Sequence, residues 1–351
     1  SPQQQVGAQP ARTVVDVSSG YFTSCAVLEL GEVWCWGRNE EASFGFYEPK
    51  ARYDETFDTQ WPRHPNPVQV PGVTTALEVS VGYRHACALL RNGSITCWGD
   101  AVEGNLGDGS TENWAWRPAR PVYGITNAVS VSSGIDRSCA LLDSGKVSCW
   151  GANVYGELGV GLDEDARQFS VVPLEVVGID NAVAISARDR TACALLADTT
   201  VECWGNNAQG QLGDGTFENR SSPVQVSGLS GVISISSGLT SCAVLETGEI
   251  SCWGVIHDAT FDAFDFWSPN LTATPELIAG IDDAVTVFPP GGKSCVVTSD
   301  GMAQCWGFTS DGLRFQNPTG VIGGLDAVDD IAIGASHICA LQRGEVLCWG
   351  D

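Results

Sequence analysis

Fourteen cysteines are the residues of this sequence whose type and spacing most directly imply chemistry. They fall into seven pairs, six with partners ten residues apart and the last with partners nine apart: Cys25 and Cys35, Cys87 and Cys97, Cys139 and Cys149, Cys193 and Cys203, Cys242 and Cys252, Cys295 and Cys305, Cys339 and Cys348. Paired thiols can form a disulfide or bind a metal ion. Because zinc ligands stand much closer together within each half of a site, we predict seven disulfides, with metal ligation or free thiols as the alternative. Disulfides would indicate an oxidising compartment, so a secreted, cell-surface or periplasmic protein.

A β-hairpin must position each cysteine pair. Between Cys25 and its partner, a three-residue loop ending at Gly31 would place the two cysteines opposite each other on one face of a sheet. Glycine recurs at this loop position in four of the other ten-residue copies, and Thr199 takes it in the fifth. In the last pair, a two-residue loop at Arg343 and Gly344 would restore the same register. Loop length and cysteine spacing therefore change together, as disulfide pairing requires.

The cysteine hairpin belongs to a longer internal repeat. Trp-Gly follows the second cysteine of all seven pairs, and we expect these tryptophans to pack in the core or between repeats. Each repeat also contains a short strand of small and β-branched residues ahead of the hairpin, and three repeats have Pro-Val after it. Four antiparallel strands repeated seven times predict an all-β fold, a seven-bladed β-propeller of four-stranded antiparallel blades with one disulfide inside each blade.

We expect residues 1–351 to form this propeller as one domain. Its repeats begin near residues 14, 76, 128, 182, 231, 284 and 328. The last repeat ends after its third strand, so residues 3–8 are the candidates for the fourth strand of the last blade.

Three repeats carry a further glycine-rich motif: Glu-Gly-Asn-Leu-Gly-Asp-Gly at 103–109, Tyr-Gly-Glu-Leu-Gly-Val-Gly at 155–161 and Gln-Gly-Gln-Leu-Gly-Asp-Gly at 209–215. With Cys-Ala-Leu-Leu and Trp-Gly, these motifs resemble the repeat of the regulator of chromosome condensation family. The resemblance covers essentially the whole chain and implies a seven-bladed propeller. The cysteine pairs are additional to the usual repeat. They suggest a distinct secreted, disulfide-containing bacterial-type branch, similar to the propeller-type β-lactamase inhibitor.

Strand direction alternates within a blade, so the loops after the first and third strands must emerge on one face. The loops nearest the axis carry these candidate binding residues: Tyr21, Phe22, Tyr83, Arg84, His85, Arg137, Arg188, Arg190, Lys293 and His337. We interpret them as a basic, aromatic-edged depression that receives an acidic group, the alternative being solvated loop charges. The outer loops carry a second set: Phe46, Tyr47, Trp61, Trp114, Trp116, Phe264, Phe266 and Trp267. These resemble a recognition surface, the alternative being that they pack long loops onto the propeller.

The charge balance limits the possible partners. Asp and Glu number 42 against 18 Lys and Arg, giving a net charge of −24, which would repel nucleic acids and anionic membranes. No apolar stretch is long enough to cross a bilayer, and no motif indicates a catalytic centre, metal site or cofactor. We therefore expect a secreted, monomeric, non-enzymatic protein that binds another protein, for example as an enzyme inhibitor or as a surface receptor or adhesion module. A glycan-binding, lectin-like propeller is the alternative, and an enzyme is the third possibility.

Overall fold

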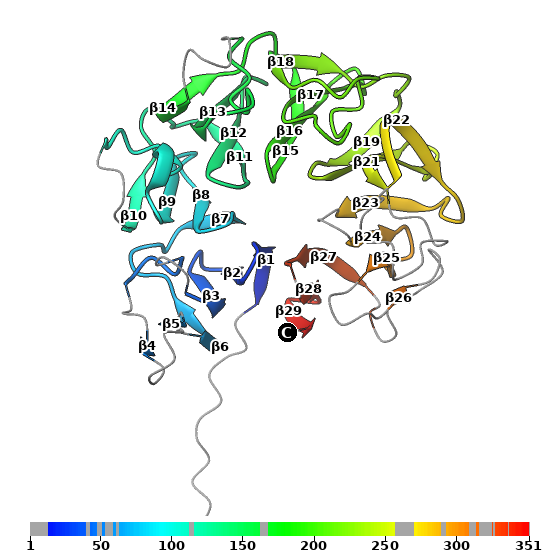
Figure 1. Cartoon of the computed structure of the whole chain (residues 1–351). Helices are drawn as coiled ribbons and strands as arrows, with labels where there is room; N and C mark the ends of the chain where they lie inside the picture. The colour runs from blue at the N-terminus through cyan, green and yellow to red at the C-terminus, as the bar shows by residue number, and fades with distance from the viewer. Residues whose placement is uncertain are drawn as a thin grey trace, which may run out of the picture.

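Seven antiparallel sheets stand around a central axis as the blades of a propeller in the computed structural model (Figure 1). The structure describes residues 13–39, 43–47, 51–52, 59–60, 63–111, 116–161, 168–256, 270–288, 293–308, 314–315, 325, 327–335 and 337–350. Within these residues, six sheets have four strands and the seventh has three. The predicted fold class is therefore confirmed.

The first four blades contain the following strands, in sheet order from the axis outwards. Blade 1 has β1 (Val14–Ser19), β2 (Thr23–Leu28), β3 (Val33–Arg38) and β6 (Arg63–Gln69). Blade 2 has β7 (Ala76–Val81), β8 (His85–Leu90), β9 (Ile95–Gly99) and β10 (Arg117–Pro121). Blade 3 has β11 (Ala128–Ser133), β12 (Arg137–Leu142), β13 (Val147–Ala152) and β14 (Phe169–Glu175). Blade 4 has β15 (Ala182–Arg188), β16 (Thr191–Leu196), β17 (Val201–Gly205) and β18 (Arg220–Gln225).

The remaining three blades follow the same order. Blade 5 has β19 (Val232–Ser236), β20 (Thr240–Leu245), β21 (Ile250–Ile256) and β22 (Asn270–Ile278). Blade 6 has β23 (Ala284–Phe288), β24 (Lys293–Thr298), β25 (Ala303–Phe308) and β26 (Arg314–Phe315). Blade 7 has β27 (Val328–Ile333), β28 (His337–Gln342) and β29 (Glu345–Gly350). Outside the blades lie a two-stranded ribbon of β4 (Ala51–Arg52) and β5 (Thr59–Gln60) and a short 3-10 helix, η2 (Val102–Gly104).

All seven predicted disulfides are formed, one in each blade. The paired cysteines lie directly opposite each other in the second and third strands, as Cys25 and Cys35 do. The predicted hairpin loops are also confirmed. Gly31 has a φ of +93° and Thr199 has +67°, while Arg343 and Gly344 have +52° and +79° in the two-residue loop. Positive φ at both positions of a two-residue loop matches the twist of the strands that it joins.

Small side chains on the inner strands join neighbouring blades. The Oγ atom of Ser18 accepts a hydrogen bond from the Val81 amide of blade 2 at 3.0 Å. The same bond recurs further round the ring, where Ser80 accepts from the amide of Ser133 at 2.8 Å. A serine side chain is just long enough to reach the backbone of the adjacent blade. Short polar residues therefore suit the strands nearest the axis.

Blades 7 and 1 close the ring, with β27 beside β1 in Figure 1. The Val14 amide donates to the Gly344 carbonyl at 2.9 Å, which ties β1 to the hairpin of blade 7. The predicted fourth strand at residues 3–8 lies outside the described residues, so it remains a prediction.

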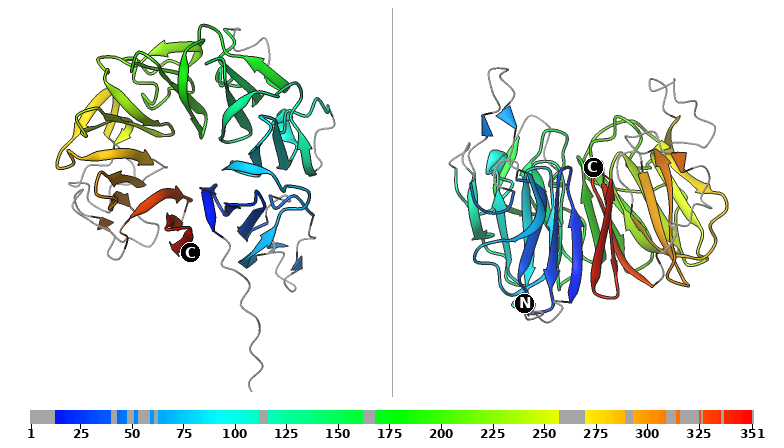
Figure 2. Two further views of the ribbon diagram at one scale, coloured as in Figure 1. Left: turned by 180° about the vertical axis from the view of Figure 1, so that it is seen from behind. Right: turned by 90° about the horizontal axis from the view of Figure 1, so that it is seen from below.

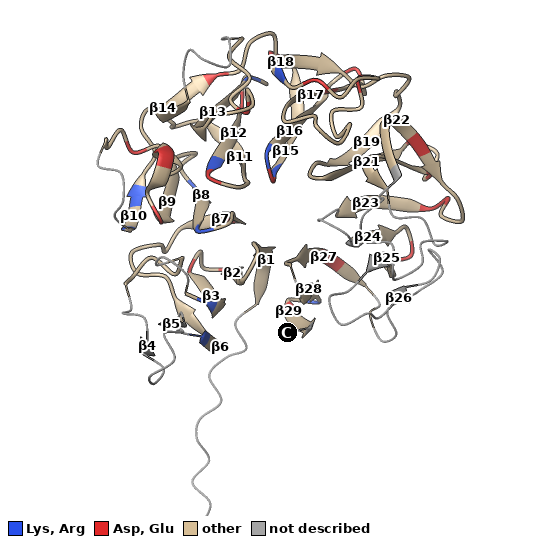
Figure 3. Cartoon of the chain, in the orientation of Figure 1, with Lys and Arg blue, Asp and Glu red and all other residues tan. Residues whose placement is uncertain are grey.

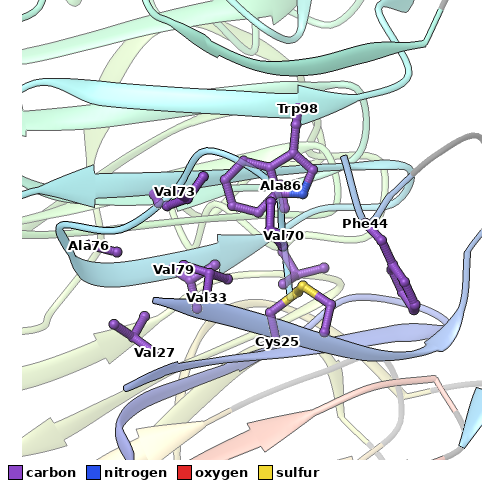
Figure 4. Packing of buried hydrophobic residues seen from close by; sticks show 13 residues of the cluster. Cys25, Val27, Val33, Phe44, Val70, Val73, Ala76, Val79, Ala86 and Trp98 are labelled. Carbon is purple, nitrogen blue, oxygen red and sulfur yellow. A yellow bond between two sulfur atoms is a disulfide. The ribbon is translucent and has the colours of Figure 1, made fainter. Parts of the chain in front are cut away.

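Each apolar core lies between two neighbouring blades. Figure 4 shows one of these cores, in which Trp98 of blade 2 packs with Val70 and Phe44 of blade 1. The tryptophans of blades 2 to 5 are at most 1% exposed, which confirms their predicted packing role: Trp98, Trp150, Trp204 and Trp253. Trp36 of blade 1 is different because it lines a cavity.

Candidate functional site

We call the end of the propeller with the loops after the first and third strands the loop face, and the end with the cysteine-hairpin tips the hairpin face. The side view in Figure 2 shows the strands running between these two ends, with the β4–β5 ribbon projecting from the loop face. The sequence-predicted residues that the structure describes belong to the loop end of the blades. The structure brings some of them together and buries others.

Three aromatic residues gather on the loop face near the axis. The Tyr21 and Tyr83 rings meet edge to face with centroids 4.9 Å apart, and Phe22 lies 6.3 Å from Tyr21. The guanidinium of Arg38 lies 4.4 Å from the Phe22 centroid, and that of Arg84 lies 4.9 Å from the Tyr83 centroid. Both distances fit cation–π attraction, which fixes each guanidinium on an aromatic face. Blades 1 and 2 thus contribute a partly exposed aromatic and basic cluster.

Tyr21 also makes a contact across the axis. Its hydroxyl donates to Oδ1 of Asp189 in blade 4 at 3.0 Å, while Oδ2 of Asp189 accepts from the Leu239 amide of blade 5 at 3.0 Å. Burial and the neighbouring Asp189 carboxylate raise the pKa of Tyr21 above its ordinary value of 10.0, so Tyr21 remains a hydrogen-bond donor. This contact links blades 1, 4 and 5.

Arg188 has a structural role beside this contact. It occupies the position, five residues before the first cysteine of its pair, where blades 1 to 3 have glycine. Its guanidinium donates to the Ile333 carbonyl of blade 7 at 2.5 Å and to the Ser19 carbonyl of blade 1 at 3.4 Å. Figure 3 shows basic residues at the inner end of β15. Arg188 of blade 4 therefore connects blades 7 and 1 by hydrogen bonds made from across the axis.

His85 and Arg137 are not on the surface where we expected them. Both are fully buried, so they cannot contact a partner directly. His85 Nε2 lies 2.9 Å from the Ser138 hydroxyl in the next blade, and burial lowers the pKa of His85 to about 4. Arg137 donates to the Thr191 carbonyl, also in the next blade, and burial lowers its pKa to about 10. The sequence analysis expected them in loops, but they begin β8 and β12, and their side chains enter the junctions between blades.

Of the other candidates near the axis, Arg190 and His337 lie at two different places. Arg190 lies 3.5 Å from the buried Glu157 carboxylate and 5.3 Å from the Tyr155 ring centroid, so it packs over the loop of blade 3. His337 Nε2 lies 2.6 Å from the Ser24 hydroxyl at the junction of blades 7 and 1. Lys293 begins β24, but its side chain lies outside the described residues.

A cavity of about 820 Å³ lies at the junction of blades 7 and 1. We call it the seam pocket. Its principal lining side chains are Phe22, Trp36, Arg38, Arg63, His64 and Trp349. Phe22 and Arg38 belong both to this pocket and to the aromatic cluster, so the two features form one continuous site. The sequence analysis missed Arg38, Arg63 and Trp36, although the first two are Arg residues in an otherwise acidic chain.

The outer aromatic set is described only in part. Tyr47 of blade 1 and Trp116 of blade 2 stack with centroids 5.8 Å apart at 16°, although they are 49% and 39% exposed. Phe46 packs against the core between blades 1 and 2. Five predicted members lie outside the described residues: Trp61, Trp114, Phe264, Phe266 and Trp267. Their roles remain predictions.

Three carboxylates line the central channel of about 320 Å³, and the sequence analysis missed them. Asp16 and Glu78 accept hydrogen bonds from the amides of the next blade, at 2.7 Å from Val79 and 3.2 Å from Val131. Burial raises the pKa of Glu78 to about 7 and that of Asp330 to about 6. Burial and both neighbouring acids raise the pKa of Asp16 well above its ordinary value. Asp16 and Glu78 each lie between two apolar residues of an inner strand, which was the signal available in the sequence.

In the part of the chain that the structure describes, no helix has the length and apolar character needed to span a membrane. Among the same residues, no three or more His, Cys, Asp or Glu side chains are grouped so that they could hold a metal ion.

Comparisons with known proteins agree with this architecture. Two profiles of the regulator of chromosome condensation (RCC1) repeat match the chain, one at residues 201–245 and the other at 14–42, 77–105 and 128–157. An RCC1-like G exchanging factor-like protein from Mus musculus is 28% identical, over 99% of this chain and 71% of its own length. The ultraviolet-B receptor UVR8 of Arabidopsis thaliana is 26% identical, over 97% of this chain and 78% of its own length.

Solved structures show the same fold at low identity. Human WBSCR16 superposes with a TM-score of 0.76 at 19% identity, over 98% of this chain and 94% of that chain. Yeast RCC1 (Prp20), solved with Kap60, gives a TM-score of 0.72 at 19% identity, over 100% of this chain and 85% of that chain. The protein is a seven-bladed β-propeller with a disulfide in each blade, and four of its segments match the RCC1 repeat.

Proposed function

We propose that this propeller is a non-enzymatic binding protein that recognises another protein through its loop face. The observation that carries the proposal is the continuous site formed by the aromatic cluster and the seam pocket. Trp, Tyr and Arg side chains are enriched among the residues that contribute most to the binding energy of protein interfaces, where they fill well-packed, desolvated pockets. Here they gather at one end of a rigid scaffold, beside a cavity of about 820 Å³.

The charge distribution supports an acidic patch on the partner. The chain has a net charge of −24, yet Arg38, Arg63 and Arg84 all belong to this one region. The local basic site attracts an acidic patch on a partner. The acidic remainder of the protein repels a surface that is acidic throughout.

Propellers of the same fold provide a precedent for binding proteins. Yeast RCC1 is described in complex with Kap60, and Prp20p with binding to Gsp1p and histones. The partners themselves are not inferred from this likeness, because function resides in particular sites rather than in the fold.

We also propose an extracytoplasmic location, because seven disulfides would be reduced in most cytoplasms. Inhibition of a secreted or periplasmic enzyme is one concrete form of the proposed function, as the resemblance to the β-lactamase-inhibiting propeller suggests. A surface receptor or adhesion module is another form.

A glycan ligand is the second candidate, and the Tyr47–Trp116 pair is the observation that favours it. Exposed aromatic rings suit stacking against sugars, and these two rings are 49% and 39% exposed. Competition by free sugars at millimolar concentration would distinguish this candidate from protein recognition.

A capture experiment tests the proposed function. The oxidised protein is immobilised and exposed to extracellular and envelope extract from its source, beside a variant carrying Phe22→Ala, Arg38→Gln and Arg84→Gln, whose side chains belong to the aromatic cluster and the seam pocket. Leu30→Ala on the hairpin face is the matched control, because Leu30 is apolar and 81% exposed. We expect a protein that the parent and the control retain and the loop-face variant loses. Retention of the same protein by all three would contradict the proposal.

A further inference from the structure

The innermost strands expose a ring of aliphatic side chains near the hairpin face. The first strand of each blade runs from the hairpin face to the loop face, and in six blades its second residue is aliphatic and 42–56% exposed. We call these residues the aliphatic ring: Val15, Leu77, Val129, Val183, Ile233 and Val285. In each of these blades the register between the first two strands shifts across this residue, which marks a β-bulge. A bulge leaves its extra residue unpaired and redirects its side chain, so one backbone feature exposes all six.

The wall that carries the aliphatic ring is complete. All seven innermost strands belong to the described part of the chain, and they surround the axis in Figure 1. Blade 7 has the same bulge, with the exposed Asp329 in place of an aliphatic residue. The neighbouring blades therefore leave the ring exposed at the hairpin end of the central channel.

Three carboxylates follow the ring on the channel wall. Asp16, Glu78 and Asp330 each come directly after a bulge residue, in three consecutive blades, and all three line the channel. Oε1 of Glu78 accepts bonds from the Ser130 hydroxyl at 3.0 Å and the Val131 amide at 3.2 Å, whereas Oε2 has no partner among the described residues. Among those residues, no basic side chain forms an ion pair with any of the three carboxylates. The channel wall therefore offers negative charge to a cation.

The loop-face end of the channel has the opposite charge. Arg188 is the one basic residue among the described side chains that line the channel. It donates to the carbonyls of Ser19 and Ile333, which are the last residues of β1 and β27. Asp16 and Asp330 precede these residues by three positions, so they lie nearer the hairpin face. A cation that enters from the hairpin face therefore meets the carboxylates before it meets Arg188.

The order of these features along the channel defines one ligand class. Alkyl groups pack on an aliphatic ring, and an ammonium group forms charge-assisted hydrogen bonds with carboxylates. A volume of about 320 Å³ lies at the lower limit of small-molecule pockets. The net charge of −24 attracts a cation and opposes the docking of a second copy.

We propose that the central channel binds a small aliphatic amine from the hairpin face. The unbranched alkyl stem lies against the aliphatic ring, and the ammonium group lies among the carboxylates of Asp16, Glu78 and Asp330. This site is separate from the loop face, so the inference goes beyond the proposed function.

Three small probes test the two parts of the ligand. Binding of n-pentylamine, as its ammonium salt, to the intact, oxidised protein is measured by isothermal titration calorimetry at pH 8. We expect one site per chain with a Kd below about 1 mM. n-Propylamine should bind at least about tenfold more weakly, because two methylene groups fewer contact the ring. n-Pentanol should also bind at least about tenfold more weakly, because it lacks the charge.

The pH dependence identifies the carboxylates involved. The titratable groups that face the ammonium are Asp16, Glu78 and Asp330, with Asp329 beside Asp330 and Arg188 at the far end. Burial raises the pKa of Glu78 to about 7 and that of Asp330 to about 6, whereas an alkylammonium group stays charged up to pH 8. Affinity should therefore increase severalfold from pH 5 to pH 8. Exposed carboxylates with ordinary pKa values are ionised throughout this range and would give no such increase.

Protein variants test the two walls of the site. Glu78→Gln can still accept the Val131 bond, but it should weaken n-pentylamine about three- to tenfold at pH 8 and reduce the pH dependence. The exposed Glu175→Gln is its control. Val15→Thr/Val183→Thr keeps β-branched side chains on opposite sides of the ring and should weaken binding at least about threefold. Val177→Thr is its control, because Val177 is 42% exposed outside the ring. Near-ultraviolet circular dichroism checks that each variant is folded.

Four outcomes would overturn the proposal. The first is absence of saturable binding at about 5 mM n-pentylamine, and the second is equal binding of n-pentanol. The third is tighter binding of Nα-acetyl-lysine amide than of n-pentylamine by about tenfold or more, which would indicate a lysine of a protein partner instead of a free amine. The fourth is tighter binding in Arg12→Gln, since Arg12 precedes β1 by two residues and a competing segment of the chain itself would then occupy the channel. We expect Arg12→Gln to leave the affinity unchanged.

Discussion

The Tyr21 hydroxyl donates to the Asp189 carboxylate at 3.0 Å, across the axis of the propeller from blade 1 to blade 4. Asp189 has a φ of +48° and is 6% exposed, so its carboxylate is held in place by an uncommon backbone conformation. Most contacts in this fold join neighbouring blades, whereas this one joins blades that are not neighbours. The hydrogen bond between Tyr21 and Asp189 therefore holds the aromatic cluster of the loop face in position.

Removal of the Tyr21 hydroxyl should destabilise the protein. Tyr21→Phe leaves the Asp189 carboxylate without one of its donors, which costs about 1–3 kcal/mol for a buried polar group. The expected fall in Tm is several degrees, measured by calorimetry. Tyr83→Phe is the matched control, since it keeps the ring contact with Tyr21 and should change Tm by less than about 1 °C. Equal decreases in Tm for the two variants would contradict a specific stabilising role for the hydrogen bond between Tyr21 and Asp189.

Arg188 should stabilise the closure of the ring. Arg188→Met keeps the unbranched stem but removes the donors to Ile333 and Ser19, so the buried carbonyls of β27 and β1 lose their partner. We expect lower Tm and faster hydrogen exchange in β1 and β27 than in β11. Arg120→Met is the control, because the Arg120 side chain is 50% exposed and lies 3.8 Å from the Asp108 carboxylate, an ion pair that should contribute little. Uniform exchange rates in β1, β27 and β11 would contradict this role.

Much of the fold could be predicted from the sequence because the residue spacing within each repeat specifies the geometry of its hairpin. Cysteine spacing and loop length change together in the last repeat, which was enough to fix the register of every hairpin. The roles of His85, Arg137 and Arg188 could not be predicted, because a residue at the end of a strand can point outwards or into the next blade. That choice depends on the positions of neighbouring blades, which local sequence does not specify. The seam pocket was missed for a related reason, since it involves blades at opposite ends of the sequence.

Acidic pH should stabilise the protein through the carboxylates of the central channel. Burial raises the pKa of Glu78 from 4.5 to about 7 and that of Asp330 from 3.8 to about 6. A raised pKa means that the folded state binds the proton more tightly than the unfolded state does. The resulting stabilisation is complete below the ordinary pKa values and is lost as the pH rises through about 6 to 7.

Thermal unfolding checks this pH dependence. Tm should be higher at pH 5 than at pH 8, by at least about 2 °C. Glu78→Gln should flatten the difference, because glutamine does not titrate and can still accept a hydrogen bond from the Val131 amide. The exposed Glu175→Gln serves as the control and should leave the slope unchanged. A Tm that increases from pH 5 to pH 8 in the parent would contradict the assignment.

Each disulfide should contribute locally. In the chain-entropy model, a loop of about ten residues is stabilised by roughly 2–3 kcal/mol when it is cross-linked. The double variant Cys139→Ala/Cys149→Ala should therefore lower Tm but leave the hairpin of blade 5 protected from exchange. Loss of protection throughout the ring after this single removal would show that the disulfides stabilise the propeller as one unit.

The central claim is that the loop face recognises a protein, and a hydrogen-exchange footprint of the captured complex tests it most directly. Binding should slow exchange in the loops at 21–22, 43–47 and 83–84 and leave the hairpin tips at 29–31, 91–93 and 143–145 unchanged. Protection confined to the hairpin tips, with the loop-face segments unaltered, would contradict the account.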